Sequence, residues 1–115
     1  MEEKVKISML CQFYGKLLTQ KQSEFINDYY NTDLSLSEIA ENNNITRQAV
    51  RDIIKKGEKK LFEYEEKLAF MKRMLKQNKK IAKILSQITK IEKGYSDKQI
   101  AIILEDVKKE LDELR

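Results

Sequence analysis

Residues 34–56 read LSLSEIAENNNITRQAVRDIIKK, and the pattern within this stretch decides the fold that we expect. Its apolar residues follow the spacing with which two short helices pack on each other, at Ile39, Ile45, Val50 and Ile53. Ala40 falls at the expected crossing of the two helices, where only a small side chain fits. Asn44 falls in the turn between them, where a positive φ is needed and Asn tolerates it well.

Residues that begin helices stand at both expected helix starts. Ser35 is followed three residues later by Glu38, which predicts a capping box for the first helix. The hydroxyl of Thr46 is suited to cap the second helix. Together with the turn and the crossing residue, these caps favour a helix-turn-helix over an arbitrary pair of adjacent helices. One position departs from the pattern, because Asn43 stands where a buried aliphatic residue is usual.

The second helix of this motif carries polar and basic side chains away from its packing residues. Arg47, Gln48 and Arg51 lie in its first turns, and Arg and Gln can bond bidentately to guanine and adenine in the major groove. The Lys residues that follow are expected to contact phosphate only. The predicted DNA-binding set is Thr46, Arg47, Gln48, Arg51, Asp52, Lys55, Lys56, Lys59 and Lys60.

The composition favours helices throughout the chain. Its 115 residues contain no Pro and three Gly, too few for the repeated turns of a sandwich or barrel. We expect an all-α fold, with a helix-turn-helix that lacks a wing and with long C-terminal helices. Residues 1–60 should hold the N-terminal helices and the DNA-binding region, and residues 61–115 a helical dimerisation region, within one compact unit.

Positive charge gathers in the middle of the chain, although the net charge is only +4. Residues 47–83 carry thirteen Lys and Arg against five acids, whereas residues 1–46 carry four Lys against seven acids. The basic block begins at the second helix of the motif, as expected for a surface that contacts phosphate. The alternative is an ordinary solvated Lys-rich face, and the coincidence with the motif favours nucleic acid.

The C-terminal half contains more apolar residues than the N-terminal helices could cover. One series has the seven-residue spacing of a weak coiled coil, at Leu61, Leu68 and Leu75, and the alternative is an amphipathic helix packed on its own domain. A helix break is expected near residues 65–69 or 77–79. Gly94 is a candidate C-cap.

A last helix should begin at Ser96-Asp97 and bury one apolar stripe. Its inward residues would be Ile100, Ile103, Leu104, Val107, Leu111 and Leu114. Because these apolar residues exceed what one chain can bury, we expect a homodimer through residues from about Leu61 onward.

Several classes of function are excluded or disfavoured. Cys11 is the only cysteine and His is absent, so an internal disulfide, a CxxC zinc site and a Cys/His nucleophile are excluded. No Gly-rich phosphate loop or metal-ligand cluster is present, so we expect neither an enzyme nor a cofactor. The longest uncharged run, residues 7–15, is too short for a membrane span or a signal peptide, which favours a cytoplasmic protein.

The run FYGKLLTQKQSEFINDYYNTDLSLSEIAENNNITRQAVRDIIKKGEKKLFEYEEKL, residues 13–68, closely resembles the YlxM family of small bacterial proteins. The resemblance is clear over about residues 3–70. Within it, the motif through Leu61 resembles region four of bacterial sigma factors, the helix-turn-helix that reads the promoter −35 element. The resemblance implies a regulatory protein of transcription that binds double-stranded DNA.

The same resemblance implies a second function of another class. The genes of this family typically lie beside that of the signal recognition particle GTPase, so the alternative is a protein or RNA adaptor of that particle without sequence-specific DNA binding. The turn residues Asn42–Asn44, the short Ala49 and the acidic Asp52 depart from the sigma-factor pattern. Recognition of the −35 element therefore does not carry over.

Overall fold

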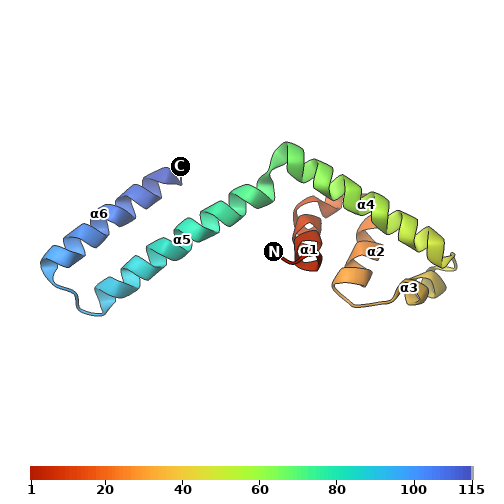
Figure 1. Cartoon of the computed structure of the whole chain (residues 1–115), viewed down its shortest axis with the longest axis horizontal. Coiled ribbons are helices and arrows are strands. Elements are labelled where there is room, and N and C mark those ends of the chain that lie inside the picture. Colours follow the sequence, from red (N-terminus) through yellow and green to blue (C-terminus); the bar gives the residue numbers. More distant parts are fainter. Residues whose placement is uncertain (115) are drawn as a thin grey trace. The chain divides into compact units, whose positions relative to one another are not determined.

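In the computed structural model of the chain, residues 1–114 are described, and they form helices without a strand. The elements are α1 (Glu3–Tyr14), the 3₁₀ turn η1 (Gly15–Leu17), α2 (Gln20–Tyr30), α3 (Leu36–Asn43), α4 (Arg47–Leu68), α5 (Phe70–Glu92) and α6 (Asp97–Glu113) (Figure 1). The expected all-α fold is confirmed. The contacts divide the chain into two compact units, unit 1 from Met1 to Met71 and unit 2 from Lys72 onward.

Unit 1 is built around α4. Helices α1, α2 and α3 all contact α4, and α3 lies at its N-terminal end (Figure 1). The core contains the fully buried side chains Ile7, Leu10, Tyr14, Phe25, Ile26, Ile39, Val50 and Leu61. Helix α4 buries Ile54 where the sequence pattern pointed to Ile53, which is only half-buried. Val50 is fully buried as expected, and the inward stripe of α4 continues from it at Ile54, Gly57 and Leu61.

Gly57 lies inside α4, and the helix continues through it without interruption. A Cβ atom at this position would lie 2.7 Å from Cδ1 of Ile26 and 3.2 Å from Cβ of Gln22, both on α2. The glycine thus allows α2 and α4 to approach closely, and its role is in packing.

Capping boxes begin three of the helices, and the one at Ser35 is as expected. Thr19 with Gln22, Ser35 with Glu38 and Ser96 with Gln99 form capping boxes at the starts of α2, α3 and α6. Each box satisfies backbone N–H groups that the first turn of a helix leaves unpaired. Gly94, with a φ of 83°, follows α5 in the left-handed conformation that a C-cap glycine adopts.

The break between α4 and α5 falls at Ala69, within the first of the two ranges expected. Ala69 has a φ of 53°, a conformation that an L-residue adopts at a cost, so the surrounding structure must impose it. The hydroxyl of Tyr14 donates to Glu65 Oε1 at 2.6 Å and accepts from the Phe70 N–H at 3.1 Å. Glu65 Oε1 also accepts from the Met71 N–H at 3.0 Å. These two side chains cap the start of α5.

This break changes the interpretation of the seven-residue series Leu61, Leu68 and Leu75. Leu61 is fully buried within unit 1, and the break at Ala69 separates Leu68 from Leu75. The three residues therefore do not form one coiled-coil seam. The boundary between the two compact units falls after Met71, because the second half of α4 and the start of α5 are held by contacts with α1.

Unit 2 is a hairpin of two antiparallel helices (Figure 1). Lys80 pairs with Glu113 and Lys83 with Glu110, which sets the register of α5 against α6. Leu104 and Leu111, expected to point inward, are exposed in the single chain. No helix within residues 1–114 is long and apolar enough to cross a membrane.

Candidate nucleic-acid interface

The turn between α3 and α4 determines where the second helix begins. Asn44 adopts a φ of 54° and a ψ of 41°, the left-handed conformation expected from the sequence, and its N–H donates toward Ala40 and Glu41. Oγ1 of Thr46 accepts from the Ala49 N–H at 3.0 Å. Asn43 is exposed, and its Nδ2 donates to the Ile39 carbonyl at 2.8 Å. The atypical Asn43 is thus accommodated at the surface by a local hydrogen bond.

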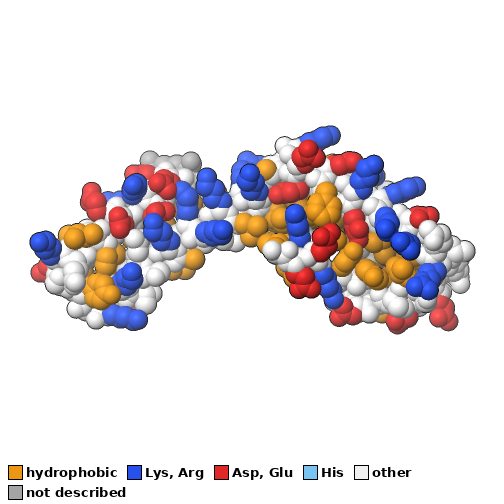
Figure 2. Space-filling view, in the orientation of Figure 1, with side chains coloured by type: hydrophobic (Ala, Val, Ile, Leu, Met, Phe, Trp, Pro, Cys, Tyr) orange, Lys and Arg blue, Asp and Glu red, His pale blue; other side chains and the backbone are white. Residues whose placement is uncertain are grey.

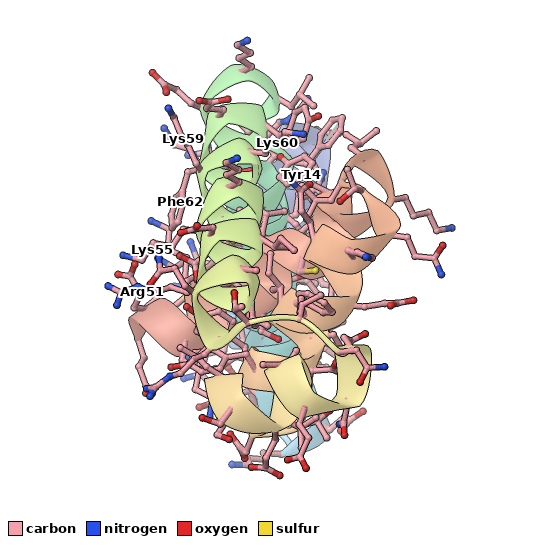
Figure 3. The ribbon with its side chains drawn as sticks, turned by 90° about the vertical axis from the view of Figure 1, so that its right-hand side faces the viewer. Tyr14, Arg51, Lys55, Lys59, Lys60 and Phe62 are labelled. Carbon is pink, nitrogen blue, oxygen red and sulfur yellow. The ribbon has the colours of Figure 1, made fainter. Side chains whose placement is uncertain are left out.

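Most of the predicted DNA-binding residues lie on the exposed side of α4. The exposed members are Thr46, Arg47, Gln48, Arg51, Asp52, Lys55, Lys56 and Lys59. Arg51, Lys55 and Lys59 are spaced four residues apart and form a row along the helix (Figure 3). Figure 2 shows Lys and Arg side chains along the outer side of α4. We call this exposed side the basic face.

Lys60 lies at the edge of the basic face. It follows Lys56, a member of that face, by four residues, which places the two about 40° apart around the helix. Lys60 is half-buried, and Figure 3 shows it on the other side of α4 from Arg51 and Lys55. Lys60 is therefore less exposed than the other three Lys residues of the predicted set.

The cations of the basic face are not engaged with carboxylates. The ion pairs found among residues 1–114 involve neither Arg47 nor Arg51, and none of the Lys residues of this face. A cation without an internal partner keeps its charge and its donors for an external anion. The basic face can therefore contact phosphate without first breaking a salt bridge.

One polar pair on the basic face is preorganised. Nε2 of Gln48 donates to Oδ1 of Asp52 at 2.9 Å, across one helical turn. Gln48 still has one free N–H and its carbonyl oxygen, the donor and acceptor that the major-groove edge of adenine requires. Asp52 thus orients Gln48, and its own negative charge disfavours a phosphate directly over this point.

A groove of about 380 Å³ borders the basic face, between the end of α2, the start of α3 and residues 51–58 of α4. Its lining residues are Tyr29, Tyr30, Leu36, Arg51, Ile54, Lys55 and Glu58. The Tyr30 hydroxyl donates to Glu58, and burial, followed by this hydrogen bond, raises the pKa of Tyr30 far above the ordinary value for tyrosine. The rings of Tyr29 and Tyr30 meet edge to face, with centroids 5.0 Å apart.

This groove was not evident from the sequence, because residues of three helices meet there. Glu58 lies within the basic block of the sequence, yet its carboxylate accepts from Tyr30. Tyr29 is partly exposed and lines the groove together with Arg51 and Lys55. The only sequence signal was the adjacent pair of tyrosines at the end of α2, which by themselves indicate a boundary between core and surface.

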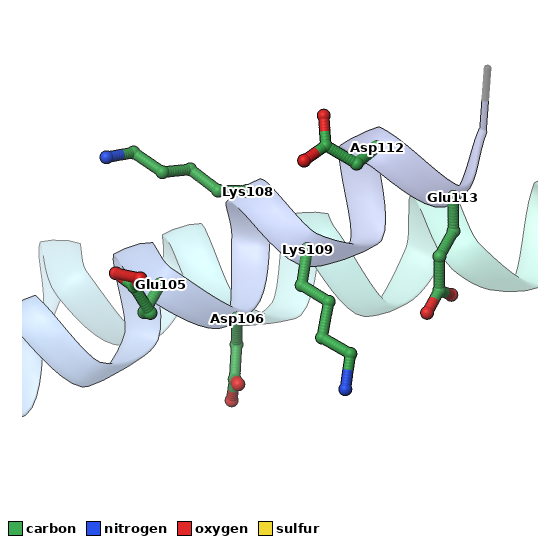
Figure 4. Close-up of a pocket in the computed structure, with 6 residues that line it drawn as sticks. All are labelled: Glu105, Asp106, Lys108, Lys109, Asp112 and Glu113. Carbon is green, nitrogen blue, oxygen red and sulfur yellow. The ribbon is translucent and has the colours of Figure 1, made fainter.

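The other candidate sites in the described part of the chain are weaker. A depression of about 570 Å³ on α6 is lined by Glu105, Asp106, Lys108, Lys109, Asp112 and Glu113. Figure 4 shows that these side chains point in different directions and do not converge. No group of residues within 1–114 could hold a metal ion. Burial raises the pKa of the Cys11 thiol, which makes it a poor nucleophile.

Comparisons with known proteins agree with the helix-turn-helix. Residues 1–107 match a family described as "UPF0122: Putative helix-turn-helix protein, YlxM / p13 like". A UPF0122 protein of Clostridium kluyveri is 46% identical over 105 residues, 90% of each chain. A UPF0122 protein of Desulforamulus reducens is 44% identical over 94 residues, 82% of this chain and 80% of that protein. A third, from Clostridium perfringens strain SM101, is 41% identical over 113 residues, 98% of this chain and 93% of its own. The chain therefore belongs to the UPF0122 family of YlxM/p13-like helix-turn-helix proteins.

Proposed function

We propose that this protein is a cytoplasmic regulator that binds double-stranded DNA through the basic face of α4. It acts by binding and carries out no chemical reaction of its own. The observation that carries the proposal is the row Arg51, Lys55 and Lys59, free of ion pairs with the other described residues, on the second helix of a helix-turn-helix. In known helix-turn-helix proteins this helix enters the major groove.

The length of α4 suggests which of its residues would contact bases and which would contact phosphates. The helix has 22 residues, or about 33 Å at 1.5 Å per residue, so only its first turns can enter a groove about 12 Å wide. Arg47, Gln48 and Arg51 lie in those turns and would contact base edges. Lys55 and Lys59 lie further along and would contact the phosphates at the groove margin.

A homodimer, the expected state, would present two such faces to DNA. Helix-turn-helix dimers bind half-sites about 34–36 Å apart, one helical turn of the duplex. The target would then be a pair of inverted half-sites. A transcriptional role follows if such sites lie in promoters.

The test is a salt titration of binding to duplexes selected from a random pool. Loss of a bidentate base contact in Arg51→Ala should cost about 1–3 kcal/mol on the selected duplex and less on a scrambled one. Lys59→Ala should weaken binding to both duplexes alike and lower the salt slope by about one. Lys67→Ala is the matched control, since Lys67 is exposed on the same helix but lies near its far end. If Arg51→Ala and Lys59→Ala both bind the two duplexes as tightly as the wild-type protein does, the proposal is wrong.

The second candidate is an adaptor that binds RNA or protein of the signal recognition particle. The observation that favours it is Asp52, whose carboxylate stands among the residues that would face the groove. Binding to folded RNA depends on shape and phosphate contacts and shows little base preference. Competition between selected duplex DNA and a folded RNA hairpin, at equal salt, decides between the two candidates.

A further inference from the structure

The hairpin of unit 2 buries few apolar side chains. Between Lys72 and Leu114 only four residues are buried, none of them completely, and two of them are polar: Ile84, Gln87, Val107 and Glu110. Oε1 of Gln87 has no hydrogen-bond partner within the described chain. A unit of about 40 residues usually needs a disulfide, a metal or a partner to be stable. The only cysteine, Cys11, lies in unit 1, and the described residues offer no metal site.

One face of the hairpin is apolar and uncovered. Helix α5 exposes Ile81, Leu85 and Ile88, and α6 exposes Leu104 and Leu111, each with 40–58% of its surface accessible. Residues advance by about 100° along a helix. Ile84 on α5 and Val107 on α6 lie at the centre of the contact between the two helices. Measured from these two residues, the exposed apolar side chains of each helix are rotated in the same direction about the helix axis. Because the two helices are antiparallel, this rotation brings both groups of side chains to one face of the hairpin, which we call the apolar face.

The opposite face of the hairpin is closed by polar contacts. Lys83 Nζ lies 2.7 Å from Glu110 Oε1, and Lys80 pairs with Glu113 one turn away. The register of these pairs places Ile81 at the level of Leu111, and Ile88 at the level of Leu104. The apolar face thus carries two matched layers, seven residues apart on each helix, which is the layer spacing of helical bundles.

We infer that the apolar face is the homodimer seam, where two hairpins pack as a four-helix bundle. A second copy fits because its layers repeat at the same spacing. Charge also favours it: α5 carries seven Lys and Arg against one acid, whereas α6 carries three Lys against six acids. Each α5 therefore lies beside the α6 of the partner, since two α5 helices would repel each other. This inference specifies the proposed homodimer and is independent of DNA binding.

The first test is the mass of the full chain, measured by sedimentation equilibrium without nucleic acid. Wild-type protein at micromolar concentration should show twice the 13.6 kDa of one chain. Leu111→Glu should raise the dissociation constant about 100-fold or more, because each dimer would bury two carboxylates in place of two leucines. Ile102→Glu is the matched control. Ile102 is 59% exposed on the opposite side of α6, so this variant should stay within about twofold of wild type.

The second test needs no variant. Amide hydrogen exchange of the wild-type protein should slow in α5 and α6 as concentration rises, while α2 and α4 show no change. A monomeric mass with exchange independent of concentration would overturn the inference and would mean that the apolar face is open or covered within the chain. A dimer that Leu111→Glu leaves intact would overturn it too, because the seam would lie elsewhere.

Discussion

The two units are built from similar amphipathic helices, but they differ in how far they bury their apolar side chains. In unit 1, four helices and a 3₁₀ turn enclose a core in which eight large side chains are completely buried. In unit 2, two helices bury two apolar and two polar side chains and leave five large apolar ones on a single face. A layer of helices can bury its apolar stripe only against another layer. Unit 1 contains its second layer, and the hairpin lacks one between residues 72 and 114.

This contrast bears on function because each unit can serve a different purpose. Unit 1 holds α3 and α4 rigidly, so the side chains of the basic face are presented by a packed helix rather than a loop. Unit 2 has no such surface and a marginal core of its own. The proposed dimeric regulator would need both, with unit 1 to contact DNA and unit 2 to associate.

The largest expected effect compares one leucine from each unit. Leu61→Ala, in the closed core, should destabilise unit 1 by about 2–5 kcal/mol, since it leaves a cavity at a fully buried position. Leu111→Ala should cost little at low protein concentration, where its side chain is half-exposed, and more at high concentration. Urea denaturation at two protein concentrations measures both. If Leu111→Ala cost the same at each concentration, the contrast between a closed and an open unit would be wrong.

A smaller effect tests how tightly unit 1 is closed. Gly57→Ala should destabilise it by about 1–3 kcal/mol, although alanine favours helix by roughly 1 kcal/mol, because the new Cβ meets Ile26 at 2.7 Å. Ile26→Val removes Cδ1 and is the control. The double variant should be more stable than the sum of the two single changes predicts, as judged from chemical denaturation. Simple additivity would show that α2 moves aside freely.

The end of unit 1 should respond to alkaline pH through Tyr14. Burial, and then the hydrogen bond to Glu65, raises the pKa of Tyr14 above its ordinary value of about 10. The folded state therefore holds this proton more tightly, so the stabilisation is complete below about pH 10 and is lost as pH rises further. Tyr14→Phe should cost about 1–2 kcal/mol at pH 8, because the Phe70 N–H loses its acceptor. Between pH 9 and 11 its stability, measured by denaturation, should fall less steeply than that of wild type.

Much of unit 1 could be predicted from sequence because its signals are local. The caps at Ser35 and Thr46, the left-handed Asn44 and the small Ala40 each depend on neighbours within a few residues. The all-α class follows from composition. The motif also located the basic face, at whose edge the half-buried Lys60 lies.

The features that sequence reasoning missed or left open depend on distant partners. The sequence left two ranges for the helix break, because no Gly or Pro marks Ala69 and the hydroxyl that accepts from the Phe70 N–H belongs to Tyr14, more than fifty residues earlier in the chain. The groove beside the basic face likewise needs Tyr30 to meet Glu58 across two helices. Periodicity records which side of a helix is apolar but not what covers it.

The smallest expected effect comes from removing the serine of one capping box in each unit. Ser35→Ala and Ser96→Ala each remove a hydroxyl that accepts from the third backbone N–H of a helix, at 3.0 and 3.3 Å, and each should cost about 1 kcal/mol. The two losses should appear in different transitions. Ser35→Ala should lower the stability of unit 1 equally at every protein concentration, whereas Ser96→Ala should weaken a transition that shifts with concentration, because the partner hairpin would stabilise α6 in the proposed dimer. Thermal melts followed by circular dichroism at two concentrations measure both. Identical concentration dependence of the two variants would mean that the hairpin folds without a second chain, and the distinction between the units would then be one of size alone.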